Sequence, residues 1–392
     1  MRPQNLPALT PAPPMNPPAP NPPAAPENIL VRGVNWLGDA VMSAPALQRL
    51  REAQPAARIT LLAPEKLAGL WDGQPFLDEL LLFSPSDTLC QTARRLRAKK
   101  FSAALAFPNS LRSALELWLA GIPRRAGYAG PWRSLFLTIP VPPRSGALPM
   151  RKRPAAQVRQ LAARGGASAA IPPGAHHTLN YLCLVAALGA SSAPLPPRLT
   201  LSQEAAEKTA AHLGMAPLPE DRPWFGLNPG AQYGPAKRWP ADRFIAAALD
   251  LQKQTRCRWV IFGGGGDCQL AAGIAAALQP SPSGPPSVLN LAGKTTLREL
   301  MAALKICRLL LTNDTGPMHI AAALGTPVVV LFGSTSPEMT RPPISTRAHI
   351  LRASDVPCSP CFLRKCPIDF RCMTRISPAA VVQAALLVLR DT

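Results

Sequence analysis

The sequence predicts an α/β protein with two successive parallel sheets, each flanked by helices. In both halves of the chain, short apolar runs typical of strands alternate with segments of helical periodicity. A stretch rich in Pro, Ala, Arg and Gly separates the two alternations, and 392 residues leave room for two domains of ordinary size. Parallel strands need a long crossover, usually a helix, so the alternation favours parallel pairing.

The first domain is expected at residues 29–220, after a proline-rich tail. Residues 1–28 contain eleven prolines and lack the apolar segment of a secretion signal, so we expect a disordered tail of polyproline II character. The domain opens as strand, loop, helix and strand, which is the start of a βαβ unit. Its predicted strands lie at 29–34, 58–63, 77–83 and 101–107, and its predicted helices at 40–54, 92–100 and 110–121.

Residues 141–178 are predicted to form an insertion or linker within this domain. They are rich in Pro, Ala, Arg and Gly, which favour loops over regular elements. A helical pattern then follows at 179–189, and Gly189 is a plausible end for that helix.

The second domain is expected at residues 221–376, where the alternation begins again. The apolar segment 377–392 follows it as a helix, and we expect this helix to pack back toward the first domain. The predicted strands of the second domain lie at 224–230, 258–266, 287–293 and 307–314, and its predicted helices at 241–254, 270–279, 297–306 and 317–324.

The turn NDTGPMH joins one of these strands to a helix. Pro317 suits the first helical position, and Gly325 suits the end of the helix. A strand that ends at a helix N-terminus directs free backbone N–H groups and the positive end of the helix dipole into a crevice, which suits a phosphate. In this turn Thr315 adds a hydroxyl group, Gly316 lets a ligand approach the backbone, and His319 faces the same opening.

Asp314 stands in the same turn, where its charge would repel a phosphate. We therefore expect it to orient the turn by accepting backbone hydrogen bonds, or to face a hydroxyl group of the ligand. The simpler alternative is that Asp314 and Thr315 only cap the helix and that His319 is a surface residue. The occurrence of these residues together with Gly316 favours the phosphate interpretation.

The loop NPGAQYGPAKRWP, residues 228–240, follows another predicted strand. It places Lys237 and Arg238 near the same crevice edge. A lysine there would neutralise a diphosphate without a metal, as a point charge on a flexible stem. The alternative is a pair of solvated loop cations.

The corresponding turn of the first domain, NWLGD, carries Asp39. Its carboxylate would be aimed into the crevice from the opposite side. Two interpretations stay open: Asp39 is a helix N-cap, or it takes a proton from an acceptor hydroxyl group.

Two glycine-containing segments match nucleotide-binding motifs only in part. FGGGGD, residues 262–267, lacks the third glycine of a dinucleotide fingerprint, because position 268 is a cysteine. Asp267 is still able to accept hydrogen bonds from a ribose. GKTT, residues 293–296, lacks the first glycine of a P-loop, and Thr296 with Glu299 predicts a capping box instead.

Four of the nine cysteines are clustered near the C-terminus. An odd number without a signal segment indicates a reducing cytosol rather than a disulfide framework. Zinc is one interpretation of the cluster, although its spacings differ from those of paired knuckles, and free thiols are favoured. We therefore expect no metal cofactor. The clustered residues are Cys358, Cys361, Cys366 and Cys372.

The net charge of +20 implies a partner that carries negative charge. Residues 90–165 contain fifteen Lys or Arg and a single acid, Glu116. Nucleic acid, an anionic membrane face and a phosphorylated substrate all suit such charge. Aromatic residues make up only 5% of the chain, which disfavours nucleic acid because bases stack on aromatic rings. The chain has no stretch of 18 apolar residues, so membrane contact would be peripheral.

Three segments give the sequence its family resemblance. ILVRGVNWLGDAVMSAPAL, NPGAQYGPAKRWP and NDTGPMHIAAALGTPVVVLFG resemble the motifs of the bacterial ADP-heptose:lipopolysaccharide heptosyltransferases, which are family 9 glycosyltransferases. The resemblance covers nearly everything from Ile29 to the end. The GPAKRWP loop and the segment CSPCFLRKCPIDFRCM resemble heptosyltransferase II members of the family.

The resemblance implies a GT-B architecture, in which two Rossmann-like domains face each other across a cleft. It implies ADP-heptose as the donor, held by the second domain, and the phosphorylated inner core of lipopolysaccharide as the acceptor, held by the first. The expected place is the cytoplasmic face of the inner membrane, with no nucleic acid as partner. The implied roles are general base for Asp39, diphosphate contact for Lys237, phosphate turn for Asp314, Thr315 and Gly316, nucleoside contact for Asp267, and a nearby position for His319.

Two rival functions belong to other classes. A nucleotide-sugar epimerase or hydrolase of the same architecture would consume the donor without an acceptor. A noncatalytic binder of nucleic acid or membranes would use the basic half of the chain, and its binding to DNA would depend steeply on salt.

Overall fold

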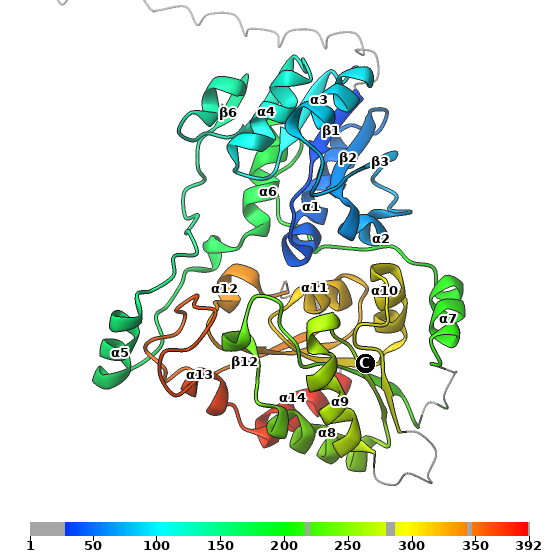
Figure 1. The fold of residues 1–392 in the computed structure, drawn as a ribbon, viewed down its shortest axis with the longest axis vertical. Coiled ribbons are helices and arrows are strands. Elements are labelled where there is room, and N and C mark those ends of the chain that lie inside the picture. The colour runs from blue at the N-terminus through cyan, green and yellow to red at the C-terminus, as the bar shows by residue number, and fades with distance from the viewer. Residues whose placement is uncertain (1–27, 216–218, 220, 280–286, 343–346, 391–392) are drawn as a thin grey trace, which may run out of the picture.

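The chain folds into two α/β domains, one above the other in Figure 1. The computed structural model describes residues 28–215, 219, 221–279, 287–342 and 347–390. The predicted proline-rich tail lies outside the described residues, apart from Asn28, which begins the first strand. No helix in these ranges is both long enough and apolar enough to span a bilayer.

The first domain is a six-stranded parallel sheet in the order β3-β2-β1-β4-β5-β6. Alternate residues of β1 face opposite sides: Ile29 and Val31 lie in the core that includes Leu47 of α1, and Leu30 lies in the core beneath α3 and α4. The strands are β1 (Asn28–Arg32), β2 (Arg58–Pro64), β3 (Glu79–Phe83), β4 (Ala103–Ala106), β5 (Arg124–Tyr128) and β6 (Ile139–Val141). The main helices are α1 (Leu37–Ala53), α2 (Ala68–Trp71), α3 (Leu89–Ala98), α4 (Leu111–Leu119) and α6 (Thr178–Val185), with a 3₁₀ turn η2 (Arg133–Phe136).

The second domain repeats this topology, with strand order β12-β11-β10-β7-β8-β9. All its strand pairs are parallel, so the prediction of two parallel α/β sheets is confirmed. The strands are β7 (Trp224–Asn228), β8 (Arg258–Ile261), β9 (Val288–Asn290), β10 (Leu309–Asn313), β11 (Val328–Phe332) and β12 (Ala348–Arg352). The main helices are α7 (Gln203–His212), α8 (Ala241–Thr255), α9 (Cys268–Leu278), α10 (Leu297–Ile306), α11 (Gly316–Ala323) and α14 (Pro378–Arg390), with short helices α12 (Pro337–Thr340) and α13 (Arg371–Thr374).

The chain passes between the domains more often than the predicted boundaries imply. After β6 it crosses to the second domain, where α5 (Ala155–Arg164) buries Val158 in that domain's core. It returns to the first domain as α6, which packs on α1, and then crosses again as α7, which packs on α10. The segments 155–164 and 203–212 therefore belong to the second domain by packing, although both fall inside the predicted range 29–220.

The expectation for the C-terminal helix is wrong. α14 packs on α8 and against β10, β11 and β12 of its own domain, at the bottom of Figure 1. Its apolar residues, including Val381 and Ala385, are buried in the second domain's core beside Ala248 of α8. The small side chains of α8 let this helix approach closely, and the sheet face there provides the apolar surface that an apolar helix needs.

Candidate active site

Each sheet reverses its strand order at one place, between β1 and β4 in the first domain and between β7 and β10 in the second. Chain segments that leave such neighbouring strands diverge to opposite faces and open a crevice at the carboxyl ends of the strands. Asp39 follows β1, Lys237 follows β7 and Asp314 follows β10. The structure thus brings the predicted residues of three different turns to the two reversal points.

The helices that start at these points meet across the domains, where α1 packs against α11. A Cβ atom on Gly316 would lie 2.6 Å from Cδ2 of Leu37, and one on Gly38 would lie 3.1 Å from Cδ2 of His319. A side chain at either position would therefore crowd the other domain, most of all at Gly316, where Leu37 would have to shift. Gly316 was expected to admit a ligand, and in this structure Leu37 occupies the space beside it.

Asp39 is the third residue of α1 and is not its N-cap. The cap position is Trp36, whose side chain makes no capping hydrogen bond. The Asp39 side chain is 31% exposed, and its Oδ1 lies 4.0 Å from Nδ1 of His177. His177 is held on the second domain by its backbone N–H, which donates to the carbonyl of Met339 at 3.0 Å. Asp39 is thus a partly open carboxylate at the domain interface.

Asp314 and Lys237 form a buried ion pair. Nζ of Lys237 lies 2.6 Å from Oδ2 of Asp314, and the hydroxyl group of Thr335 donates to the same oxygen at 2.6 Å. Burial alone would raise the pKa of Asp314, but the charge of Lys237 and the hydrogen bonds from Lys237 and Thr335 outweigh it and lower that pKa. Asp314 therefore fixes the lysine and satisfies a hydroxyl group of the protein itself.

His319 is buried rather than at the surface, so the alternative interpretation of this residue is wrong. Burial lowers the pKa of its imidazole to about 4, against the opposing influence of the Asp314 and Asp39 charges. The ring is accordingly neutral near pH 7, and it lies against Gly38 of the first domain.

Two asparagines that sequence reasoning missed connect the turns. Asn228, the last residue of β7, donates through Nδ2 to the hydroxyl groups of Thr312 and Thr315, at 3.1 and 2.9 Å. Asn313, the last residue of β10, donates to the carbonyl of Pro229 at 2.8 Å. The signal was available in the sequence, since each is a polar residue at the carboxyl end of a buried apolar strand. These bonds hold the loop after β7 against the turn after β10.

Arg238 and Asp267 form a second pair in this region, with Nη2 of Arg238 2.9 Å from Oδ1 of Asp267. The other oxygen of Asp267 accepts a hydrogen bond from the backbone N–H of Gly264 at 3.1 Å. The carboxylate also lies directly against Gly230, where no Cβ atom would fit. Asp267 therefore ties the glycine-rich turn to the loop after β7. The predicted capping box of Thr296 and Glu299 is confirmed at the start of α10.

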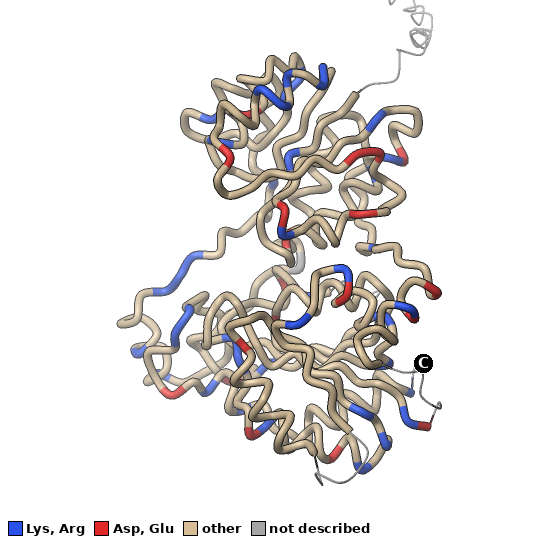
Figure 2. Tube along the Cα trace, turned by 45° about the vertical axis from the view of Figure 1, so that its right-hand side comes forward, with Lys and Arg blue, Asp and Glu red and all other residues tan. Residues whose placement is uncertain are grey.

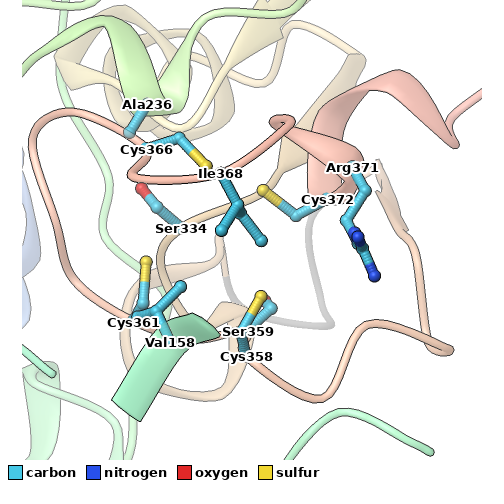
Figure 3. Close-up of a pocket in the computed structure, with 10 residues that line it drawn as sticks. All are labelled: Val158, Ala236, Ser334, Cys358, Ser359, Cys361, Cys366, Ile368, Arg371 and Cys372. Atoms are coloured by element: carbon cyan, nitrogen blue, oxygen red, sulfur yellow. The ribbon is translucent and has the colours of Figure 1, made fainter. Parts of the chain in front are cut away.

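The four clustered cysteines line one small pocket together with Val158 of α5, as Figure 3 shows. They are free thiols, and burial raises the pKa of Cys372 to about 12, so its thiolate form is disfavoured. Within the described ranges, no group of three or more His, Cys, Asp or Glu side chains is arranged to hold a metal ion. The cysteine loop supports the site mechanically, because the Tyr233 hydroxyl group donates to the carbonyl of Phe362 at 2.7 Å and Nζ of Lys237 lies 5.2 Å from the Tyr233 ring centroid.

Comparison with known proteins identifies the family. Residues 89–370 match the model of glycosyltransferase family 9 (heptosyltransferase). Lipopolysaccharide heptosyltransferase 2 of Escherichia coli is 31% identical over 334 residues, which are 83% of this chain and 87% of that protein. Lipooligosaccharide heptosyltransferase 2 of Haemophilus influenzae is 31% identical over 338 residues, or 83% and 88% of the two chains.

The fold agrees with these relatives. The solved structure of the Escherichia coli ADP-heptose lps heptosyltransferase II superimposes with a TM-score of 0.72 at 28% identity, covering 93% of this chain and 99% of that one. The two facing domains are accordingly those of the GT-B architecture. The chain is an enzyme of the glycosyltransferase class and belongs to glycosyltransferase family 9, the heptosyltransferases.

Proposed function

We propose that the chain transfers heptose from ADP-L-glycero-D-manno-heptose to the heptosylated inner core of lipopolysaccharide, with inversion and without a metal. The observation that carries this proposal is the opposition of two turns across the domain interface. One turn carries the partly exposed Asp39, and the other carries the Lys237–Asp314 pair at the start of α11. The names of the relatives, heptosyltransferases 2, support heptose as the transferred group.

On the donor side, Lys237 and the N-terminus of α11 would hold the diphosphate. The ammonium group is already placed by Asp314, so binding would cost little reorganisation. As the bond between the sugar and ADP breaks, negative charge grows on the leaving phosphate, and a fixed cation with free backbone N–H groups stabilises it. Thr315 and Gly316 would line this turn, while Arg238 and Asp267 would bound the nucleoside side.

On the acceptor side, Asp39 would remove the proton from a heptose hydroxyl group as its oxygen attacks the anomeric carbon. The side chain is open enough to meet a hydroxyl group and lies on the first domain, opposite the donor turn. Attack from the face opposite the leaving ADP inverts the anomeric centre. The charge on the leaving group is met by Lys237 and the helix, so the step needs no metal.

We expect the two domains to move relative to each other during the catalytic cycle. Leu37 of the first domain lies against Gly316 at the very turn where a diphosphate would bind. We therefore expect the domains to separate when ADP-heptose enters and to close again around both substrates. The expected place of action is the cytoplasmic face of the inner membrane, where the acceptor is anchored.

Release of ADP tests the proposal. The purified protein is incubated with ADP-heptose, with and without a heptosylated core acceptor, and ADP is measured over time. Transfer predicts release that depends on the acceptor and a product heavier by one heptose. Consumption of the donor without an acceptor would instead indicate an epimerase or hydrolase. Absence of any turnover, together with salt-dependent binding to DNA, would indicate a noncatalytic binder.

A further inference from the structure

Large apolar side chains are exposed to solvent on one face of the first domain. The relative exposures are 76% for Trp132, 73% for Leu135, 46% for Trp118 and 43% for Leu111. We call these residues the α4–η2 face, after the elements that carry or adjoin them. They are half of the eight exposed large apolar side chains in the described part of the chain, so they are concentrated rather than scattered.

The α4–η2 face is a continuous surface. α4 packs against η2, and the Trp118 ring meets the Phe136 ring edge-on, with centroids 5.3 Å apart. α3 packs along the other side of α4 and adds exposed cations. The whole group therefore forms one side of the domain, in the upper part of Figure 1.

Cations surround this face, and its one acid is removed from the surface. Residues 90–137 contain nine Lys or Arg and a single acid, Glu116. The Glu116 side chain is only 1% exposed and is paired with Arg32 and Arg112. The exposed charge contributed by this segment is therefore entirely positive, and Figure 2 shows the basic residues gathered along the top of the first domain. Those exposed are Arg94, Arg95, Arg97, Lys99, Lys100, Arg112 and Arg124. Three of them are ion-paired, Arg95 with Asp87, Lys99 with Glu79 and Arg112 with Glu116.

We propose that the α4–η2 face docks the protein on the surface of an anionic phospholipid bilayer. Tryptophan side chains prefer the interface between lipid and water, and clustered Lys and Arg are attracted to anionic headgroups. Charge complementarity favours this partner. The proposal rests on the proposed function, in which the acceptor is anchored in such a bilayer.

The position of the face suits that role. α4 follows β4, and β4 is the strand that flanks the reversal point beside β1. Leu111, the first residue of α4, is therefore near the end of the sheet that carries Asp39. Trp118 lies near the other end of α4, so the face runs along the side of the first domain from its crevice end outward. Docking would place that side of the domain, and not the crevice itself, on the membrane.

Vesicle co-sedimentation tests the docking surface directly. Wild-type protein and the double variant Trp132→Ala/Leu135→Ala are mixed with vesicles of phosphatidylglycerol and phosphatidylethanolamine, and with vesicles of phosphatidylcholine alone. We expect the double variant to bind the anionic vesicles at least about tenfold more weakly than wild type. The matched control is Leu387→Ala, which removes a half-exposed leucine from α14 in the other domain and should bind as wild type does. Arg94→Gln/Lys100→Gln should weaken binding to anionic vesicles by about fivefold per charge and should not change binding to phosphatidylcholine.

The outcomes separate this proposal from the proposed function. With a soluble core acceptor that lacks lipid chains, the double variant should transfer heptose at the wild-type rate. Equal vesicle binding by wild type and the double variant would overturn the docking surface. So would a lower rate on the soluble acceptor, which would assign the face to glycan binding, or a dimer in solution that the double variant breaks. If wild type binds vesicles but transfers no heptose, the docking surface stands and the proposed function fails.

Discussion

Two strand-to-helix turns, one in each domain, hold their aspartates in opposite ways. In the second domain, the Asp314 side chain is only 4% exposed and is engaged by Lys237 and Thr335. In the first domain, the Asp39 side chain is 31% exposed and faces His177 at 4.0 Å. Both turns lead from a strand at a reversal point into a helix, so the difference comes from the neighbours that each turn receives.

This difference assigns different chemistry to the two carboxylates. A carboxylate that is saturated by a lysine and a hydroxyl group has a lowered pKa and is a poor acceptor for a further proton. A carboxylate at an open interface is free to meet a substrate hydroxyl group. The comparison therefore favours Asp314 as an anchor and Asp39 as a base, and each variant below is chosen to break or sharpen it.

Asp39→Asn should have the largest effect. Removing a general base is expected to lower kcat by about 10²- to 10⁴-fold, while ADP affinity changes little because ADP is assigned to the other domain. ADP release measures the first quantity and calorimetry with ADP measures the second. Asp72→Asn, an exposed carboxylate next to α2, is the control. Near-normal turnover by Asp39→Asn would refute the assignment of the base.

Lys237→Ala should weaken ADP binding by at least tenfold, since a hydrogen bond to a charged group is worth about 1.5–3 kcal/mol. It should also lower the free energy of unfolding by about 3–5 kcal/mol, because Asp314 is left buried without its cation. The double variant Lys237→Ala/Asp314→Asn should regain most of that stability without regaining ADP affinity. If the double variant recovered both, Lys237 would serve the fold and not the diphosphate.

Burial lowers the pKa of His319, and the charges of Asp314 in its own domain and Asp39 in the other domain oppose that shift. The pKa of His319 is about 4 in the folded protein and 6.5 ordinarily, so between these values the unfolded chain binds the extra proton. Folding stability should therefore fall by roughly 3 kcal/mol as the pH drops from about 6.5 to about 4. His319→Gln should flatten that window in urea unfolding experiments.

Asp314 also makes folding stability depend on pH, but over a more acidic range than His319 does. Its folded pKa is lowered, so its contribution is complete above the ordinary carboxylate pKa and is lost as the pH falls through the folded value. The His319→Gln variant should still lose the stability that Asp314 contributes when the pH falls through the lowered pKa of Asp314. Identical pH profiles for wild type and His319→Gln between pH 4 and 6.5 would contradict the buried neutral imidazole.

Local sequence patterns predicted those helices and strands whose first or last residues carry a recognisable signal, such as a capping box. The helix expected at 297–306 is α10, because the Thr296 and Glu299 capping box fixes its start. Four strands, β5, β6, β11 and β12, were not among those predicted. β5 begins with Arg124 and Arg125 and so shows no apolar run, while β12 is an edge strand whose residues are only partly buried. Both are recognisable as strands only once their parallel neighbours are in place.

The site was predictable as a set of turns but not as a set of contacts. Polar residues after buried strands indicated where Asp39, Lys237 and Asp314 would gather, because parallel strands deliver their carboxyl ends to one edge. The pairing of Asp314 with Lys237 joins residues 77 positions apart. The contact of His177 with Asp39 joins the start of α6 to α1, more than a hundred residues earlier in the chain, and the contact of Gly38 with His319 depends on how the two domains meet. No local pattern encodes such contacts.

The variant with the smallest expected effect, Gly316→Ala, tests the contact between the two domains. Gly316→Ala would place a methyl group 2.6 Å from Cδ2 of Leu37, so the side chain or the domain must shift, at a cost of about 1–3 kcal/mol. We expect kcat/KM to fall by roughly tenfold, because closure around both substrates is impaired. Leu37→Ala removes the atom that the methyl group meets, so Gly316→Ala/Leu37→Ala should recover more activity than the sum of the two single changes predicts. Strict additivity in this cycle would mean that Gly316 is required by the ligand and not by the first domain.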